Sequence, residues 1–354
     1  MKMKKIVTWL LLAAMMVSLA ACGKKAQESG GQNEPSVEDD NKKGDADKTP
    51  EVTEKEDVKI AALKGPTALG MLKMIHDSEE KNTPDNYEFT LAGSADEILG
   101  SIIQGQFDIA AVPTNVAAIL YNKTQSAVQL AALNTLGVLY VVETGDSVNS
   151  ISDLAGKTIY SLGKGSTPEY ALKYLLTKNG LDPEKDVTVE YKSEATEVAA
   201  LMANGEASIA LLPQPFVTSL KLQNENVRVA LNVTEEWNKV GEGSTLTMGC
   251  IVVQKKFAEE HPEALKRFME AYEASVEFTN GADTLETAAQ YAEDFGIIPK
   301  KAVAAKAIPE CNIVFKAGDE MKTIAGGFLQ VMYDADPSSV GGTLPDDAFY
   351  YNAK

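Results

Sequence analysis

Four short segments of this sequence combine hydroxyl, amide and amine side chains with the signals that start helices. They are residues 64–68 (KGPTA), 113–115 (PTN), 163–167 (GKGST) and 213–215 (PQP). The first backbone N–H groups of a helix lack intrahelical partners and carry partial positive charge, so such turns can hold a polar or anionic ligand noncovalently. Taken singly, each turn is also explained by ordinary helix capping. Their arrangement along the chain therefore has to decide between binding and capping.

These turns belong to a repeat. Residues 94–120 align with residues 194–220 without a gap, and "QGQFDIAAVPTN" from Gln104 corresponds to "NGEASIALLPQP" from Asn204. Each unit predicts a helix that ends at a glycine, then a short and fully apolar strand, then a second helix after a proline. The identical pairs are Ala95/Ala195, Glu97/Glu197, Gly105/Gly205, Ile109/Ile209, Ala110/Ala210, Pro113/Pro213 and Leu120/Leu220.

The similarity extends upstream of the aligned segments. "VKIAALKGPTALGMLK" from Val58 and "KTIYSLGKGSTPEYALK" from Lys157 both pass from a β-rich run through a glycine turn into a helix. Thr167 is the expected N-cap of the second of these helices, with Pro168 at its first position. The sequence therefore predicts two α/β lobes. Because ligands bind at the carboxyl ends of parallel strands, all four turns line one cleft if the lobes face each other.

The sequence has few residues of the kinds that carry out catalysis. Its histidines, His76 and His261, both lie near predicted helix ends, where exposure to solvent explains them. There is no paired-His, paired-Cys or Gly-x-Ser-x-Gly motif, and "GKGSTP" lacks the spacing of a phosphate-binding loop. "DDNKKGDAD" resembles a calcium loop, but Lys43 and Pro50 stand where oxygen ligands are required. We expect no enzyme activity, no metal and no cofactor.

The N-terminus has the features of a secreted lipoprotein. Residues 1–21 combine early lysines with an apolar run too short for a comfortable membrane span, which is typical of a signal peptide. The run ends in Leu-Ala-Ala-Cys-Gly, which resembles a lipobox and predicts acylation of Cys22. Residues 22–57 contain almost no large apolar side chains and predict a disordered tether.

Composition narrows the classes of partner. The formal net charge is -18, which argues against binding nucleic acid or being held electrostatically on anionic lipid. Residues 58–354 are more than one compact core usually takes, which also favours two lobes. Cys250, in an apolar strand-like run, and Cys311, after a Pro-Glu turn, are expected to be buried free thiols. A disulfide between them remains an alternative.

The mature chain resembles the solute-binding proteins of bacterial ABC importers, in particular those for nitrate, sulfonates, taurine and thiamine-pyrimidine precursors. The resemblance is carried by the lipobox, by "ISDLAGKTIYSLGKGSTPEYALKYLLTKNGLDPEKDVTVEY" from Ile151, by "EVAALMANGEASIALLPQPFVT" from Glu197 and by "FAEEHPEALKRFMEAY" from Phe257. It implies a two-lobed α/β fold of the type II periplasmic-binding-protein class, with two crossovers and a ligand cleft between the lobes. Lobe I is expected at residues 58–142 plus 248–354 and lobe II at 143–247.

The resemblance also implies the function and its residues. The crossovers are expected near Val142-Glu143 and Ser244–Met248, and the lobes close over a small solute that is delivered to the permease subunits. The protein is expected to be a monomer, held by Cys22 on the extracytoplasmic face of the membrane of a host that is more typically Gram-positive. The ligand-contacting residues carried over are Lys64, Gly65, Pro66, Thr67, Ala68, Thr114, Asn115, Asn134, Ser166, Thr167, Gln214 and Met248.

One departure bears on the ligand. Members of the wider class that bind amino acids typically hold the carboxylate with an arginine, and here Arg228 and Arg267 lie away from all four turns. A small, neutral or weakly anionic and even aromatic solute is therefore favoured over a free amino acid. Two alternatives use the same fold: a sensor that presents the closed lobes to a membrane receptor, and, less favoured, an enzyme.

Overall fold

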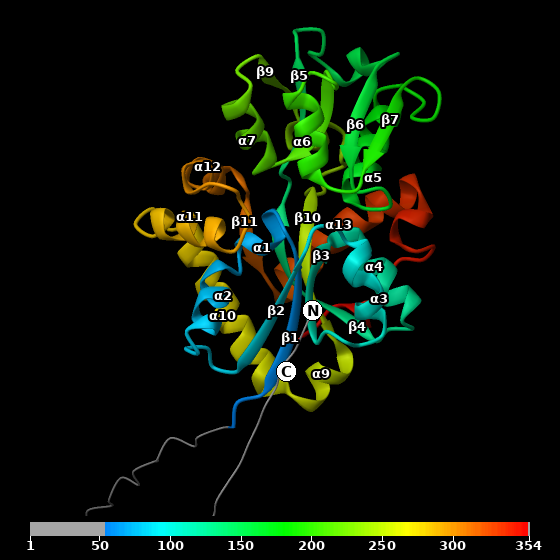
Figure 1. The fold of residues 1–354 in the computed structure, drawn as a ribbon. Helices are drawn as coiled ribbons and strands as arrows, with labels where there is room; N and C mark the ends of the chain where they lie inside the picture. The colour runs from blue at the N-terminus through cyan, green and yellow to red at the C-terminus, as the bar shows by residue number, and fades with distance from the viewer. Residues whose placement is uncertain (1–53, 353–354) are drawn as a thin grey trace, which may run out of the picture. The chain divides into compact units, whose positions relative to one another are not determined.

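The computed structural model describes residues 54–352, so the signal peptide, Cys22 and most of the tether lie outside the described residues. Within them the chain forms two α/β lobes, each built on its own sheet (Figure 1). The folded part of the chain begins slightly before residue 57, the predicted end of the tether. The Glu56 amide already donates to Asp85 Oδ1 at 3.0 Å, and the first strand begins at Asp57.

The first sheet has six strands in the order β11-β4-β10-β3-β1-β2. Strand β1 pairs in parallel with β2 and β3, whereas β10 runs antiparallel to β3 and β4, and β11 runs antiparallel to β4. The bounds are β1 Asp57–Leu63, β2 Asn86–Ala92, β3 Ile109–Pro113, β4 Val128–Leu136, β10 Thr247–Gln254 and β11 Ile313–Lys316.

The second sheet repeats this plan with five strands in the order β7-β6-β8-β5-β9. Strand β6 is parallel to β7 and β8, and β5 is antiparallel to β8 and β9, so β6, β7, β8 and β5 correspond to β1, β2, β3 and β10. The structure thus confirms the predicted internal repeat. The bounds are β5 Leu139–Thr144, β6 Thr158–Leu162, β7 Thr188–Lys192, β8 Ile209–Pro213 and β9 Val227–Asn232.

The chain crosses between the lobes at two places. The first crossing is at residues 137–138, because β4 belongs to the first sheet and β5 to the second. The expected boundary at Val142-Glu143 is therefore wrong: β4 and β5 are nearly continuous in their apolar pattern, and nothing in that pattern marks the change of sheet. The second crossing, at residues 241–246, precedes β10 and agrees with the expected position at Ser244–Met248 to within a few residues.

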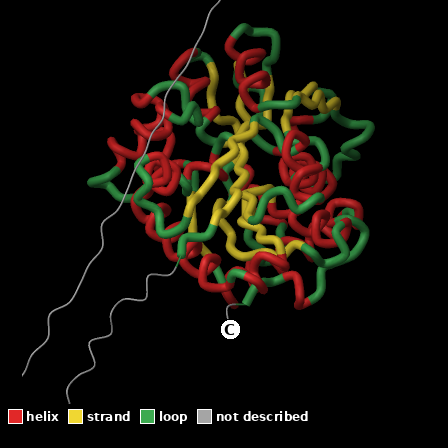
Figure 2. Tube along the Cα trace, turned by 60° about the horizontal axis from the view of Figure 1, so that its bottom comes forward, coloured by secondary structure: helices red, strands yellow, loops and turns green. Residues whose placement is uncertain are grey.

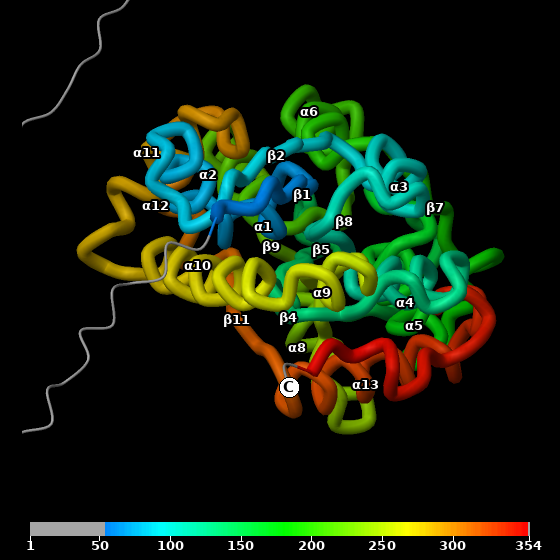
Figure 3. Tube along the Cα trace, turned by 90° about the horizontal axis from the view of Figure 1, so that it is seen from below, coloured from blue at the N-terminus to red at the C-terminus, as the bar shows by residue number. Residues whose placement is uncertain are grey.

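Helices cover both faces of the strands, which run through the middle of the molecule in Figure 2. Seen from below, α2, α10, α11 and α12 lie on one side and α4, α5 and α13 on the other (Figure 3). Their bounds are α1 Pro66–Leu69, α2 Leu72–Glu79, α3 Asp96–Ile103, α4 Thr114–Lys123, α5 Thr167–Lys178, α6 Ala195–Ala203, α7 Phe216–Gln223, α8 Val233–Val240, α9 Lys255–Glu260, α10 Pro262–Asn280, α11 Leu285–Asp294, α12 Lys301–Ala307 and α13 Gly318–Ala335. Short 3₁₀ turns are η1 Ile151–Leu154, η2 Ile308–Glu310, η3 Pro337–Val340 and η4 Asp347–Phe349.

One apolar cluster joins the two lobes. The fully buried Trp237 of α8 packs against Tyr174 of α5 with ring centroids 4.9 Å apart. On its other side it packs against Phe328 of α13, in the first lobe, at 5.7 Å. The lobes are therefore in contact through a packed aromatic group as well as through the two crossing segments.

Candidate binding site

A cavity of about 210 Å³ lies between the lobes, at the carboxyl ends of their parallel strands. Each of the four turns singled out in the sequence contributes to its lining, so the prediction that they meet at one place holds in the structure. The lining residues are Leu63, Lys64, Pro66, Thr67, Gly93, Ser94, Ala95, Pro113 and Met248 with Gly296, Ile297 and Pro299 from the first lobe, and Leu162, Gly163, Ser166, Pro168, Ser193, Glu194, Ala195, Thr196, Pro213 and Phe216 from the second.

The turn before α5 shows how the local sequence shapes this lining. Strand β6 ends at Leu162, and Gly163 and Gly165 both have left-handed φ values, of 73° and 76°, that favour glycine. Ser166, not Thr167, is the N-cap of α5, and its Oγ donates to the Gly163 carbonyl at 2.7 Å. Pro168 accordingly occupies the second helical position. The reversal brings the start of α5 directly against the cavity.

Two further helix starts reach the cavity and were missed from the sequence. Residues 93–95 precede α3 and residues 193–196 contain the start of α6, and both segments line it. A signal was present, because the repeat aligns Ser94 with Glu194 and the sequence around Ser94 has the form of a capping box. The Ser94 amide does donate to Glu97 Oε1, at 2.8 Å. Because β2 and β7 run parallel to β1 and β6, their ends meet the same edge as the ends of those strands.

Most of the lining is apolar. Leu63, Leu162, Phe216, Met248 and Ile297 come from different elements of both lobes and surround the space. A Cβ added to Gly65 would lie 3.6 Å from Phe216 Cε2, so the two lobes touch at this side of the cavity. A cavity with this lining excludes water from the apolar part of a ligand and leaves polar recognition to the turns.

Two ionisable side chains reach the lining, Lys64 from the first lobe and Glu194 from the second, and both are exposed. Neither arginine is near them. Arg267 makes a bidentate contact to the fully buried Asp85, and Arg228 donates to Glu143 Oε2 at 2.7 Å. Burial raises the pKa of Glu143, but hydrogen bonds from Ser147, Val148 and Arg228 outweigh burial and hold this pKa below its usual value.

Asn115 and Thr167 lie beside the cavity and connect the lobes instead of lining it. Asn115 is fully buried, and its Nδ2 donates to the carbonyls of Gly165 at 3.3 Å and Ser339 at 3.0 Å. Its Oδ1 accepts a hydrogen bond from Thr167 Oγ1 at 3.1 Å. Asn115 therefore joins α4 to the glycine turn of the second lobe and to η3.

Of the remaining predicted residues, Asn134 and Gln214 have structural hydrogen-bond partners, whereas the buried Thr114 hydroxyl has none among the described residues. Asn134 Nδ2 donates to the Thr67 carbonyl at 3.2 Å and so supports a turn that lines the cavity. Gln214 Oε1 accepts hydrogen bonds from the amide and the hydroxyl of Thr218, a residue of α7. Ala68 and Thr114 are fully buried, and Gly65 faces Phe216. Of the twelve predicted ligand contacts, Lys64, Pro66, Thr67, Ser166 and Met248 line the cavity.

Cys250 and Cys311 are buried free thiols, as expected, and burial raises the pKa of both. Among residues 54–352 there is no group of three His, Cys, Asp or Glu side chains arranged to hold a metal ion. Of the helices in this part of the chain, none is long and apolar enough to cross a membrane.

Comparison with known proteins gives one matching family and a shared fold. The family model for the periplasmic substrate-binding protein of phosphonate ABC transporters matches residues 80–298, more than half of the chain. No curated protein matches the chain at a significant level. Among solved structures, an ABC transporter protein from Parabacteroides distasonis is similar at 24% identity and a TM-score of 0.67, with 84% of this chain and 99% of that chain covered.

Two further structures share the fold at lower identity. The alkanesulfonate-binding protein SsuA from Xanthomonas axonopodis pv. citri, solved with bound MOPS, has 16% identity and a TM-score of 0.64, covering 80% of this chain and 94% of its own. The nitrate-binding protein NrtA from Synechocystis PCC 6803 has 12% identity and a TM-score of 0.60, covering 81% and 84%. These likenesses confirm the predicted two-lobed fold.

Proposed function

The chain belongs to the phosphonate family of periplasmic substrate-binding proteins, the substrate-binding components of ABC importers, and from this premise we propose that it captures a small solute with an oxyanion group at one end and an apolar remainder. The cavity between the lobes is the proposed site. The observation that carries the proposal is that helix starts from both lobes meet at one cavity whose other walls are apolar.

The oxyanion is assigned to the helix starts. The segments that begin α3, α5 and α6 all line the cavity, and each of these helices has at least eight residues. The unpaired amides and the partial positive charge at such ends favour a phosphonate or sulfonate group. Lys64 is the one cationic side chain of the lining. An anion held mainly by amides and hydroxyls fits a site that has no arginine.

The apolar remainder is assigned to Leu162, Phe216, Met248 and Ile297, which line the same space. An available volume of about 210 Å³ suits a short alkyl chain or a single ring. The structural relatives include an alkanesulfonate-binding and a nitrate-binding protein, and both of those ligands carry an oxyanion group. The proposed solute is therefore an alkyl or aryl phosphonate or sulfonate, which is more strongly anionic than the neutral or weakly anionic solute expected from the sequence.

Capture works as a population shift. A solute that contacts both lobes only when they are together favours the closed form, because a ligand shifts an equilibrium by its differential affinity for the two states. The closed form is the one proposed to dock with the permease. The same scheme makes the two crossing segments, residues 137–138 and 241–246, the hinge.

Thermal unfolding against a panel of compounds tests the ligand class. The panel contains methyl-, butyl- and phenylphosphonate, the matching sulfonates, nitrate, thiamine and free amino acids. A compound at a hundred times its dissociation constant stabilises the folded protein by about 2.7 kcal/mol, which is a readable rise in Tm. A rise with phosphonates or sulfonates supports the proposal. A rise with amino acids alone, or no rise with any oxyanion, contradicts it.

A pair of variants locates the site. Lys64→Ala removes the cation of the lining and should weaken oxyanion binding by about tenfold or more, because hydrogen bonds to charged groups contribute about 1.5–3 kcal/mol. Lys59→Ala removes an exposed lysine of β1, the strand that Lys64 follows, at a position outside the cavity and should leave binding unchanged. Equal affinities for both variants would place the anion elsewhere.

The proposed location is the extracytoplasmic face of the membrane, with Cys22 as the lipid anchor. The support comes from the sequence, where Cys22 follows a signal-like segment and Leu-Ala-Ala. Intact-mass measurement of the membrane fraction should show a diacylglycerol-sized addition that disappears in Cys22→Ala. Recovery of unmodified protein from membranes would contradict the anchor.

A further inference from the structure

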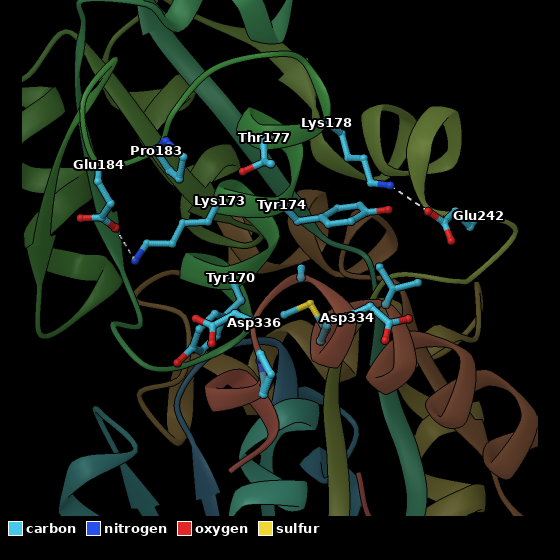
Figure 4. A pocket seen from close by; sticks show the side chains of 14 residues that line it. Tyr170, Lys173, Tyr174, Thr177, Lys178, Pro183, Glu184, Glu242, Asp334 and Asp336 are labelled. Atoms are coloured by element: carbon cyan, nitrogen blue, oxygen red, sulfur yellow. Dashed lines mark hydrogen bonds and ion pairs between the residues drawn. The ribbon is translucent and has the colours of Figure 1, made fainter. Parts of the chain in front are cut away.

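A second hollow between the lobes is separate from the first. It is a groove of about 560 Å³ between α5 of the second lobe and the end of α13 with η3 of the first (Figure 4). We call it the back groove, and it is lined by Tyr170, Lys173, Tyr174, Thr177, Lys178, Pro183, Glu184, Glu242, Val331, Met332, Asp334, Ala335, Asp336 and Pro337. None of these residues lines the cavity at the carboxyl ends of the parallel strands.

The hinge runs between the cavity and the back groove. Glu242, in the second crossing segment, lines the groove, whereas Met248, near the start of the β10 strand that follows, lines the cavity. Helix α5 shows the same division, since Ser166 and Pro168 at its start face the cavity and residues 170–178 face the groove. A rotation of one lobe about this hinge therefore narrows one hollow as it widens the other.

Two lysines on one side of the groove make no ion pair with the two aspartates on the other, because each lysine is paired with a glutamate that also lines the groove. The second-lobe wall presents Lys173 and Lys178, and the first-lobe wall presents Asp334 and Asp336 (Figure 4). Within residues 54–352 the ion pairs of both lysines are made to glutamates of their own side. Those pairs are Lys173 with Glu169 at 3.0 Å and with Glu184 at 2.9 Å, and Lys178 with Glu242 at 2.8 Å.

Both aspartates keep acceptor capacity for a new partner. Asp334 accepts one hydrogen bond, from Gln330 Nε2 at 2.8 Å, and Asp336 accepts one from the Ser338 amide at 2.9 Å. A carboxylate has room for further donors on both oxygens. Lys173 stays charged, because burial lowers its pKa less than its glutamate partners raise it.

Asn115 links the two hollows. It bonds the Gly165 carbonyl in the glycine turn at the cavity and the Ser339 carbonyl in η3. The same 3₁₀ turn begins at Pro337, which lines the back groove. In this structure hydrogen bonds of Asn115 hold the lobes together at the cavity, and the groove is open.

We propose that the back groove is a latch for the open, solute-free form. When the cavity opens, the groove closes and brings Lys173 and Lys178 against Asp334 and Asp336. These ion pairs then oppose closure and set how much binding free energy the solute must supply. The inference rests on the proposed clamp motion and adds the residues that determine its equilibrium.

Single-molecule energy transfer tests the latch without a solute. Dyes are placed through cysteines substituted for the exposed Gln104, at the end of α3, and Gln223, in α7, in a chain that starts at residue 23. In Asp334→Asn/Asp336→Asn both amide oxygens still accept the hydrogen bonds of Gln330 and Ser338, but the charges are gone. The ratio of open to closed molecules at low salt should fall by about twofold or more, because two exposed ion pairs of the open form are lost.

Salt and a control variant make the result decisive. In the wild type, raising KCl from 0.05 to 1 M should shift molecules towards the closed form, and in the double variant this shift should be small. Glu259→Gln/Glu260→Gln removes two exposed charges from α9, outside the groove, and should behave as the wild type. Two populations with unchanged ratios in the groove variant overturn the latch. A single population that added phosphonate or sulfonate never shifts overturns the clamp itself.

Discussion

Replacing Asn115 by alanine should weaken solute binding although Asn115 does not line the cavity. Its amide group makes three hydrogen bonds, and two of them, to the Gly165 carbonyl and from Thr167 Oγ1, cross to the second lobe. These two bonds must break when the lobes separate. The third, to the Ser339 carbonyl, stays within the first lobe. The substitution therefore acts on closure more than on folding.

The size of the effect follows from the two crossing bonds. At a net contribution of about 0.5–1.5 kcal/mol each, their loss destabilises the closed form by about 1–3 kcal/mol and raises the apparent dissociation constant by about 5- to 150-fold. Loss of the Ser339 bond should lower Tm by about 2–4 °C. The energy-transfer assay should show more open molecules even without a solute, which a residue that only touches the ligand would not produce.

Asn122 offers a matched control on the same helix. Its Nδ2 donates to the carbonyls of Val340 and Thr343, both at 2.8 Å, and all three residues belong to the first lobe. Asn122→Ala should cost similar stability and leave both the open population and the affinity unchanged. The reasoning is refuted if Asn115→Ala binds the screened solute as tightly as Asn122→Ala does, with the same open population.

Three further substitutions test other parts of the structure. The pKa of Glu143 is held below its usual value in the folded state, so its contribution to stability is present near neutral pH and is lost as pH falls below about 4.5. Glu143→Gln should lose about 1.5–3 kcal/mol at pH 7, because the charge-assisted bonds to the carboxylate are lost while Arg228 stays partly exposed to solvent, and should show a shallower acid decline in urea unfolding at graded pH. The Tyr272 hydroxyl is buried without a hydrogen-bond partner among the described residues, so Tyr272→Phe should leave Tm unchanged or raise it slightly, and a fall of several degrees would mean that the hydroxyl has a partner. Gly65 has a φ of 127°, so Gly65→Ala should cost about 1–3 kcal/mol in urea unfolding, and an unchanged midpoint would contradict the strain.

The parts of the fold that follow from local sequence could be predicted. The strand–turn–helix pattern is a short-range signal, and it correctly placed the ends of β3 and β8 and the start of α4, with glycine at positions such as Gly105 and Gly205 that need positive φ. Repetition of the pattern then required two similar lobes, which the two sheets confirm. That the resulting cavity binds the solute stays a prediction.

What the sequence could not predict depends on contacts between distant segments. Whether Asn115 points into the cavity or across to Gly165 and Ser339 is decided by how the lobes and η3 pack, and Ser339 is 224 residues away. The first crossing is equally hidden, because Leu136 and Leu139 are both apolar and their neighbours in the sheets come from elsewhere in the chain. The short-range pattern of apolar residues predicts which side chains are buried, but it does not predict which residues they contact.

The departures from the repeat are therefore the places to look for ligand specificity. Two identical lobes would enclose a cavity with matching walls, suited to a ligand with two similar ends. Here several aligned positions of the two lobes differ. Ser94 of the first lobe aligns with Glu194 of the second, and the buried Val116 aligns with Phe216, which lines the cavity. Because the first lobe contributes the cation Lys64 and the second contributes the anion Glu194 and the ring of Phe216, the cavity is unlike at its two sides. An amphiphilic solute, with one charged and one apolar end, is the kind that such a cavity distinguishes from a symmetric one.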